Sequence, residues 1–299
     1  MRTMLESIHF LLSYTCNFEC DHCFLYCGPG AGGTFKIEQI CNVLDQAVET
    51  GSVKGVCFEG GEPMLYYPLM LEGIRQARQR GLSAGIVTNA YWATSEADAE
   101  LWLRPLHELG VKSITMSDDP LHYGSNAGAH KQRVEAAAAK LGMGAGVICT
   151  NRPAVQAATA TEPAKVVGSV MFRGRAADKL TEGLPVRPWE SFTRCTHEKL
   201  EAPSRVHVDS FGNVHLCQGL CMGNLWQTPL KQMLAEYDPQ AHPIVGPILR
   251  GGPAQLVRER GLDHAEGYVD ECHLCHVARK ALMPRYAKEL APPQVYGTK

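Results

Sequence analysis

Short apolar runs alternate with segments of helical spacing from residue 8 to residue 172, and this rhythm limits the possible folds more than any other feature. The apolar runs predict six strands: HFLLSY, GVCFEGG, SAGIVTNA, VKSITMSD, GAGVICTN and KVVGSVMF. Helical patterns lie between them, at residues 37–51, 69–79, 96–109 and 130–141. Strands that alternate with helices form βαβ units and a parallel sheet. Six strands are too few for a complete eight-strand barrel of about 250 residues, so we predict an α/β fold, a partial (β/α)6 TIM-like barrel.

The rhythm ends near residue 173, and a second region of different character follows. The stretch TEGLPVRPWESF indicates a linker, and RVHVDSFGNVHLC predicts a β-hairpin that turns at residues 211–213. Short helices are expected near residues 230–237 and 253–261, and a last one begins at the closing cysteines. We therefore expect a partial barrel over residues 1–180 and a small α+β domain over residues 181–299.

The composition excludes several classes of protein. The chain has 299 residues, a net charge of −2 and a pI near 6.6, so no basic surface indicates nucleic acid or anionic lipid. No secretory signal pattern stands at the start, and no apolar stretch approaches the roughly 20 residues of a membrane span. Twelve cysteines are too sparse for a disulfide scaffold of this length. We expect a cytoplasmic protein whose reduced thiols serve metal or redox chemistry.

The stretch SYTCNFECDHCFLY carries Cys16, Cys20 and Cys23 in the spacing C-x3-C-x2-C, and Cys27 follows closely. A disulfide, a zinc site and an iron–sulfur cluster are the alternatives. Zinc knuckles usually pair two C-x2-C units, and the ferredoxin spacing C-x2-C-x3-C-P is missed at two points. Three thiolates on three irons of a 4Fe–4S cluster leave the fourth iron open, as catalysis requires. Cys27 is open to either interpretation, near the reaction centre or only a loop thiol.

This cysteine spacing, on the loop after the first strand of a β/α barrel, resembles the radical S-adenosylmethionine (SAM) superfamily. His22 stands where that family usually has an aromatic residue. A second likeness is CFEGGEPMLYYP, in which Gly60, Gly61, Glu62 and Pro63 end the second strand. The resemblance implies that this motif binds the amino group of SAM through backbone oxygens and the acidic side chain. GGEP alone is also an ordinary strand-to-helix turn, but the two motifs in this order favour the family.

The resemblance implies further cofactor contacts at the ends of later strands. Thr88 or Asn89 follows the third strand and could face SAM. Ser117 is similar to the residue that the family uses near the ribose or carboxylate, with Asp118 beside it. Both are equally good turn formers. Arg175, in a GRA segment, is a candidate for the SAM carboxylate, with a surface ion pair as the alternative.

A second group of cysteines lies in the C-terminal region. Their order resembles the twitch domain, a shortened SPASM domain that holds one auxiliary 4Fe–4S cluster. The likeness implies four ligands: Cys195, Cys217, Cys272 and Cys275. A zinc site with the same thiolates stays open, and Cys221 could replace one ligand.

The resemblance implies an enzyme with two 4Fe–4S clusters, one of which binds SAM. Reductive cleavage of SAM would give a 5′-deoxyadenosyl radical that removes a substrate hydrogen, and the auxiliary cluster would support net oxidation or bond formation on a small molecule. A ribosomal-peptide maturase is the alternative, which the short segment before Cys16 mildly disfavours. A flavodoxin- or ferredoxin-type protein would donate electrons, and neither nucleic acid nor membrane is an expected partner. Other classes left open are an iron–sulfur electron carrier and a zinc-stabilised binding module. No catalytic base is identified.

Overall fold

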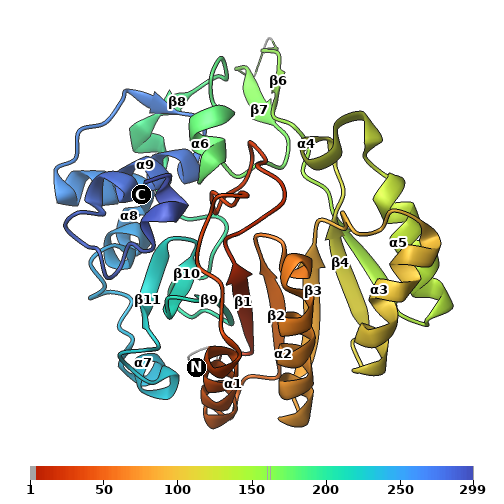
Figure 1. Cartoon of the computed structure of the whole chain (residues 1–299). Helices are drawn as coiled ribbons and strands as arrows, with labels where there is room; N and C mark the ends of the chain where they lie inside the picture. Colours follow the sequence, from red (N-terminus) through yellow and green to blue (C-terminus); the bar gives the residue numbers. More distant parts are fainter. Residues whose placement is uncertain (1–4, 160, 162, 299) are drawn as a thin grey trace.

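An eight-stranded sheet forms the centre of the computed structural model, which describes residues 5–159, 161 and 163–298. The strand order is β11-β10-β9-β1-β2-β3-β4-β5 (Figure 1). Strands β1 to β5 and β9 are parallel, while β10 and β11 are antiparallel. The bounds are β1 Ser7–Ser13, β2 Gly55–Gly60, β3 Ser83–Thr88, β4 Ser113–Ser117, β5 Gly144–Ile148, β9 Arg205–Asp209, β10 Asn213–Cys217 and β11 Leu220–Asn224.

Helices pack on the outer face of this sheet. They are α1 (Ile37–Glu49), α2 (Tyr67–Gln79), α3 (Glu96–Glu108), α5 (Ala129–Lys140) and α7 (Leu230–Glu236). Strand residues alternate in direction, so Ile8, Phe10 and Leu12 of β1 meet these helices in one large core. The predicted α/β class is confirmed, and the four helices expected between residues 37 and 141 are present within two residues at each end.

The inner face of the sheet carries polar side chains beside apolar ones such as Val87 of β3 and Ile148 of β5. Residues that alternate with the core positions are His9 on β1, Glu59 on β2, Thr115 on β4 and His207 on β9. Branched apolar residues normally fill the interior of a closed barrel. Here β5 and β11 are the outer strands of an open sheet, and the inner face borders a cavity. The structure is therefore a partial barrel, as predicted.

The predicted sixth barrel strand is wrong. Within residues 165–172 only β7 (Lys165–Val167) is a strand, and it pairs antiparallel with β6 (Ala154–Gln156) in a separate ribbon. Val155 and Val167 are 50% and 41% exposed, so their apolar side chains do not drive this segment into the core. Gly168 has φ +132°, which turns the chain out of the extended path after β7. The place beside β1 belongs to β9, from the C-terminal region.

The C-terminal region contains the predicted hairpin, formed by β9 and β10, and adds β11 as a third strand. Its main helices are α8 (Val245–Arg260), broken at Gly251-Gly252, and α9 (Glu271–Leu282), which pack together in a second core. Smaller elements are α4 Pro120–Tyr123, α6 Arg175–Lys179, β8 Arg187–Pro188 and β12 Gly267–Tyr268, and the 3-10 turns Pro63–Tyr66, Gly124–Asn126, Trp189–Ser191 and Pro293–Tyr296. The main sheet contains strands from before and after residue 180 in the sequence, and the division into two domains at this residue stays a prediction. Among the described residues, no helix has the length and apolar character to cross a membrane.

Candidate functional site

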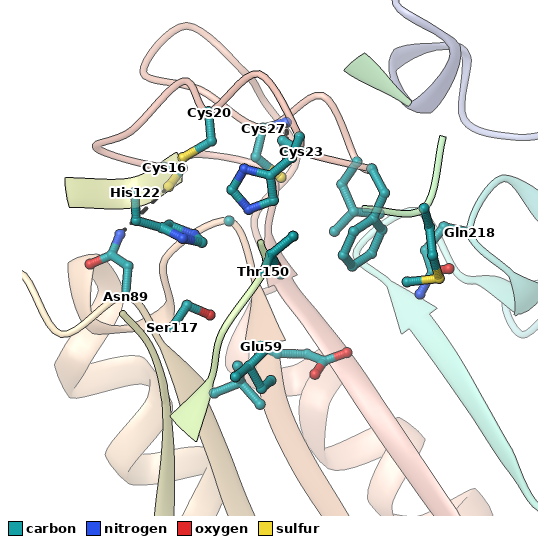
Figure 2. Close-up of a pocket in the computed structure, with 18 of the residues that line it drawn as sticks. Cys16, Cys20, Cys23, Cys27, Glu59, Asn89, Ser117, His122, Thr150 and Gln218 are labelled. Carbon is teal, nitrogen blue, oxygen red and sulfur yellow. Dashed lines mark hydrogen bonds between the residues drawn. The ribbon is translucent and has the colours of Figure 1, made fainter. Parts of the chain in front are cut away.

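A cavity of about 590 Å³ lies against the inner face of the sheet and extends to the carboxyl ends of the strands. Figure 2 shows Cys16, Cys20 and Cys23 at one end of this cavity and Glu59 toward the other. The predicted site residues that line it are Cys16, Cys20, His22, Cys23, Gly60, Gly61, Asn89 and Ser117. Four of the predicted SAM-binding residues are not part of the lining: Glu62, Pro63, Asp118 and Arg175. Sequence motifs from four strand ends therefore meet at one cavity.

Backbone and side-chain N–H groups surround the sulfur atoms of the first cysteine group. The amide of Phe18 lies 3.4 Å from Cys16 Sγ, and the amide of Cys27 lies 3.3 Å from Cys23 Sγ. Asn89 Nδ2 lies 3.8 Å from Cys16 Sγ. Such donors stabilise thiolates and tune a bound cluster.

At least one pair of these sulfurs, among the described residues, is too far apart to share a single zinc ion. Thiolates on one zinc ion, each about 2.3 Å from the metal, lie less than about 4 Å apart. Among the described residues, the sets of three donors within 4.8 Å of one another do not include Cys16, Cys20 and Cys23. A 4Fe–4S cluster takes each thiolate on a different iron, which requires wider spacing. The three residues present therefore fit a 4Fe–4S cluster.

Cys27 is buried beside Cys23 and also lines the cavity. A hydrogen bond between the two thiols holds the pKa of Cys27 well above its usual value. The two interpretations of Cys27, near the reaction centre or only a loop thiol, stay predictions.

Arg175 donates hydrogen bonds to backbone carbonyls of the cysteine loop. Its guanidinium donates to the carbonyls of Cys20 at 2.7 Å and Cys27 at 2.8 Å, and its own amide donates to the carbonyl of Cys23 at 2.9 Å. The arginine also lies over the ring of Tyr26. It thus holds the backbone of the loop, and its predicted contact with the SAM carboxylate stays a prediction.

The two glycines after β2 are required by the close passage of two chain segments. Gly60 has φ +125°, and a Cβ atom there would meet the carbonyl oxygen of Ser13 at 2.6 Å. A Cβ atom on Gly61 would meet the carbonyl oxygen of Thr15 at 2.1 Å. The amides of Gly61 and Glu62 donate to these same carbonyls. The glycines therefore bring the end of β2 against the cysteine loop, with backbone facing the cavity.

Glu62 is fully buried and joins two strand ends. Its carboxylate accepts hydrogen bonds from Thr88 Oγ1 at 2.7 Å, the Asn89 amide at 2.7 Å and the Met64 amide at 3.0 Å. Burial raises the pKa of Glu62 to about 7, against the effect of these donors. Pro63, also buried, begins the 3-10 turn that follows.

Asp118 has a comparable supporting position at the end of β4. Its carboxylate accepts from the amides of Gly128 and Lys131, both at 2.7 Å, and so fixes the start of α5. Ser117, its neighbour, faces the cavity. The predicted SAM contacts of both residues stay predictions.

Several cavity residues were missed by the sequence analysis. The most important are His9, Glu59 and His207, which lie on three neighbouring strands, and His122 and Thr150, which follow β4 and β5. The alternation of strand residues places His9 and Glu59 opposite the core face, which is the signal that could have identified them. No local pattern places His207 beside them.

The second cysteine group also meets at one place. Cys195, Cys217, Cys272 and Cys275 line a small cavity together with Arg173 and Arg279. Both arginines are buried, and Arg173 Nη1 lies 2.9 Å from Cys217 Sγ. The Nε atoms of both have no hydrogen-bond partner. Arg173 also pairs with Glu198 at 3.4 Å, and thiolates that carry a negatively charged metal group would supply further anionic partners for the two buried arginines in this cavity.

Cys221 is not part of this lining. Its sulfur lies 3.7 Å from His215 Nδ1 and 3.4 Å from the carbonyl of Ala291, and the residue is fully buried. It lies on β11, opposite His215 of β10, and is not among the residues that line the cavity of the four predicted ligands.

The comparisons with known proteins agree with this geometry. Residues 10–119 match the model of the Radical SAM superfamily. The putative peptide biosynthesis protein YydG of Bacillus subtilis is 22% identical over 117 residues, which cover 39% of this chain and 37% of YydG. The tungsten-containing aldehyde ferredoxin oxidoreductase cofactor-modifying protein of Pyrococcus furiosus is 28% identical over 123 residues, 41% of this chain and 33% of that protein. The chain thus spans about a third of the length of these curated relatives.

Two crystal structures of BtrN are among the solved structures similar to this chain, each at 16% sequence identity. The complex with AdoMet and 2-DOIA has a TM-score of 0.49 and covers 80% of this chain and 85% of that chain. The open conformation has a TM-score of 0.47, with 80% and 83% covered.

Proposed function

Because residues 10–119 form a radical SAM domain, we propose that this chain is a radical SAM enzyme with its cofactors in the cavity described above. The observation that carries the proposal is the meeting of Cys16, Cys20 and Cys23 with the Gly60-Gly61 turn at the carboxyl ends of the strands. This is the end of a β/α barrel where active sites are found.

The chain offers separate groups for the cluster and for SAM. Cys16, Cys20 and Cys23 each bind one iron, and the fourth iron is left for the amino and carboxylate groups of SAM. Gly60 and Gly61 present backbone to the methionine end, while three side chains on other strand ends contact the rest of the molecule: His22, Asn89 and Ser117. When bound, the cluster and SAM would supply radical chemistry, one-electron cleavage of SAM followed by hydrogen-atom removal from the substrate, and the residues named here would hold them in place.

The remaining inner face binds the substrate. It is lined by polar side chains of β1, β2, β4 and β9, which can orient a polar small molecule by hydrogen bonds. A positioned C–H bond close to the radical, in a site that excludes water, is what the reaction needs.

The four C-terminal cysteines bind the auxiliary 4Fe–4S cluster in this proposal. Two residues, Arg173 and Glu198, line both cavities, which supports a short connection between substrate and auxiliary cluster. Held by these cysteines, the cluster would supply an acceptor for one electron of the substrate radical, which would support net oxidation or bond formation on a small molecule. A flavodoxin- or ferredoxin-type protein supplies the first electron.

A second candidate is the same chemistry on a ribosomally made peptide. The similarity to YydG, a protein named for peptide biosynthesis, favours this alternative. Assays with small alcohols or amino sugars and with short peptides, each scored by deoxyadenosine release above background, separate the two.

The decisive experiment is anaerobic reconstitution followed by iron and sulfide analysis and a deoxyadenosine assay with dithionite. Two 4Fe–4S clusters correspond to about eight irons per chain. Cys20→Ala is expected to abolish SAM cleavage, and Cys272→Ala with Cys275→Ala to leave about four irons. The matched control is Cys149→Ala, since Cys149 is exposed and outside both cavities. Zinc in place of iron, or no deoxyadenosine from a fully loaded chain, would contradict the proposal.

A further inference from the structure

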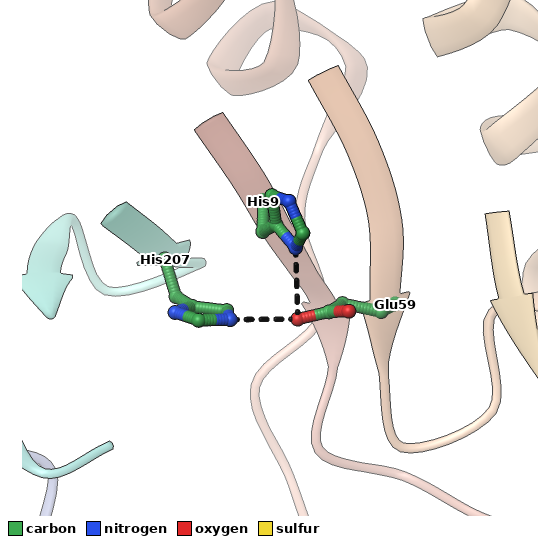
Figure 3. Close-up of side chains that lie close together, drawn as sticks. All are labelled: His9, Glu59 and His207. Carbon is green, nitrogen blue, oxygen red and sulfur yellow. Dashed lines mark ion pairs between the residues drawn. The ribbon is translucent and has the colours of Figure 1, made fainter. Parts of the chain in front are cut away.

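Three side chains on neighbouring strands form a group on the inner face that the cofactor chemistry does not use. We name His9, Glu59 and His207 the His–Glu–His group; they come from β1, β2 and β9 (Figure 3). His9 of β1 lies directly opposite His207 of β9 in the parallel pairing. Glu59 of β2 lies opposite Leu11, which is two residues after His9 on β1. All three side chains line the large cavity.

The donor atoms of this group have the spacing of metal ligands. His207 Nε2 lies 2.9 Å and His9 Nδ1 lies 3.4 Å from the same oxygen of Glu59, and all three donors lie within 4.8 Å of one another. Ligands about 2.0–2.2 Å from one ion lie roughly 2.8–3.6 Å apart in octahedral or tetrahedral geometry. We propose that the His–Glu–His group binds a divalent transition-metal ion inside the cavity.

The three side chains of the group face one another inside the cavity and are largely shielded from water. The side chains of His9, Glu59 and His207 are 19%, 18% and 7% exposed. Among the described residues, the polar partner of His9 Nδ1 is this Glu59 oxygen, and the contact of 3.4 Å does not have the geometry of a hydrogen bond. An ion would satisfy this nitrogen and the carboxylate together.

Another set of three donors, His22, Asp119 and His122, is a weaker candidate. Asp119 already accepts from the amides of Leu121, His122 and Thr150, because it caps α4. The only ion-pair partners recorded for the Glu59 carboxylate, among the described residues, are the two histidines of its own group. Arg205, a cation that also lines the cavity, pairs with Glu198 at 3.6 Å.

Two imidazoles and one carboxylate favour Zn²⁺, Fe²⁺ or Co²⁺ over Mg²⁺ or Ca²⁺. Three protein ligands leave coordination positions open toward the cavity, as in catalytic metal sites. An oxygen or nitrogen of the substrate is the ligand that these positions would take. The binding of the ion rests on these three residues alone and stands whether or not the chain cleaves SAM.

Cobalt provides the test, because it is distinct from the iron of the clusters in elemental analysis. The cluster-loaded chain, with its clusters oxidised and silent in electron paramagnetic resonance, is dialysed anaerobically against Co²⁺. We expect about one Co²⁺ per chain, and pulsed resonance should detect nitrogen couplings from two imidazoles. This second readout needs no variant.

The variants Glu59→Gln and His207→Gln are expected to weaken Co²⁺ binding about tenfold or more. The matched control His122→Gln removes a donor of the other set and should bind Co²⁺ like the wild type. Iron content and circular dichroism show whether each variant is folded. Equal Co²⁺ binding by all four proteins, no bound Co²⁺, or cobalt without imidazole couplings would each overturn the proposal.

Discussion

Glu62 illustrates how one residue of a short motif can support a site from outside the cavity. The carboxylate accepts from Thr88, Met64 and Asn89, and Asn89 in turn approaches the sulfur of Cys16. A fully buried carboxylate with three donors fixes the strand ends on which the proposed cofactor contacts depend. Burial destabilises the ionised form of the Glu62 carboxylate and raises its pKa to about 7.

The raised pKa predicts a specific pH dependence for the SAM-free chain. Between about pH 4.5 and 7 the folded state holds the proton of Glu62 and the unfolded state does not. The free energy of unfolding therefore falls as pH rises through this window, by roughly 3 kcal/mol at most. Glu62→Gln lacks this contribution, so the wild-type thermal midpoint should fall by several degrees relative to the variant between pH 5 and pH 8.

The measurement is the difference between wild-type and variant midpoints in scanning calorimetry at several pH values. Glu38→Gln is the matched control, because Glu38 is an exposed glutamate on α1. A midpoint difference for Glu62→Gln that is the same at every pH would contradict the prediction.

At the scale of elements, the short helix α6 fixes the cysteine loop that lies more than a hundred residues earlier in the chain. Arg175 satisfies the carbonyls of Cys20 and Cys27, and a loop with few regular hydrogen bonds depends on such contacts. The loop itself is too irregular to hold three thiols in place by local structure.

Replacement of Arg175 by Met should therefore loosen the cysteine loop. Two carbonyls lose their donor, which costs about 1–3 kcal/mol for each group left unsatisfied. Hydrogen exchange of the amides in residues 14–28 should accelerate, and the iron bound by the N-terminal cysteines should decrease. Lys179→Met, on the exposed side of the same helix, is the control and should change neither. Unaltered exchange in Arg175→Met would contradict the bracing role.

At the scale of the whole molecule, one sheet runs through both regions that the sequence suggested. β9 pairs with β1 along five residues, from Ser7–Arg205 to Leu11–Asp209, and supplies His207 to the cavity. Its Val206 and Val208 are fully buried in the same core as Phe10. The partial barrel therefore borrows a strand from beyond residue 180.

A fragment of residues 1–180 is expected to fail as an independent fold. Without β9, β1 becomes an exposed edge strand with unpaired backbone groups and an uncovered apolar side. The fragment should self-associate in gel filtration and lack a cooperative unfolding transition. The full chain should elute as a monomer or as a defined oligomer and unfold cooperatively. A monomeric fragment that unfolds cooperatively would instead establish the domain division at residue 180.

Local patterns determined much of this protein. The period of two in the strands and of 3.6 in the helices predicted β1 to β5 and their helices, because each pattern lies within about a dozen residues. The spacing of Cys16, Cys20 and Cys23 and the GGEP turn likewise depend on neighbouring residues only. The order of strands then placed both motifs at one edge of the sheet.

The tertiary structure alone decided which strand pairs with β1 on the side away from β2, and which distant residues support the cysteine loop. The sixth apolar run, KVVGSVMF, had the composition of a strand, yet β9 pairs with β1 instead. The valines of β9 complete the core there. His207 and Arg175 reach the cavity and the cysteine loop from far along the chain. Such contacts depend on which distant segments bury the most apolar surface together, and no short stretch of sequence records that competition.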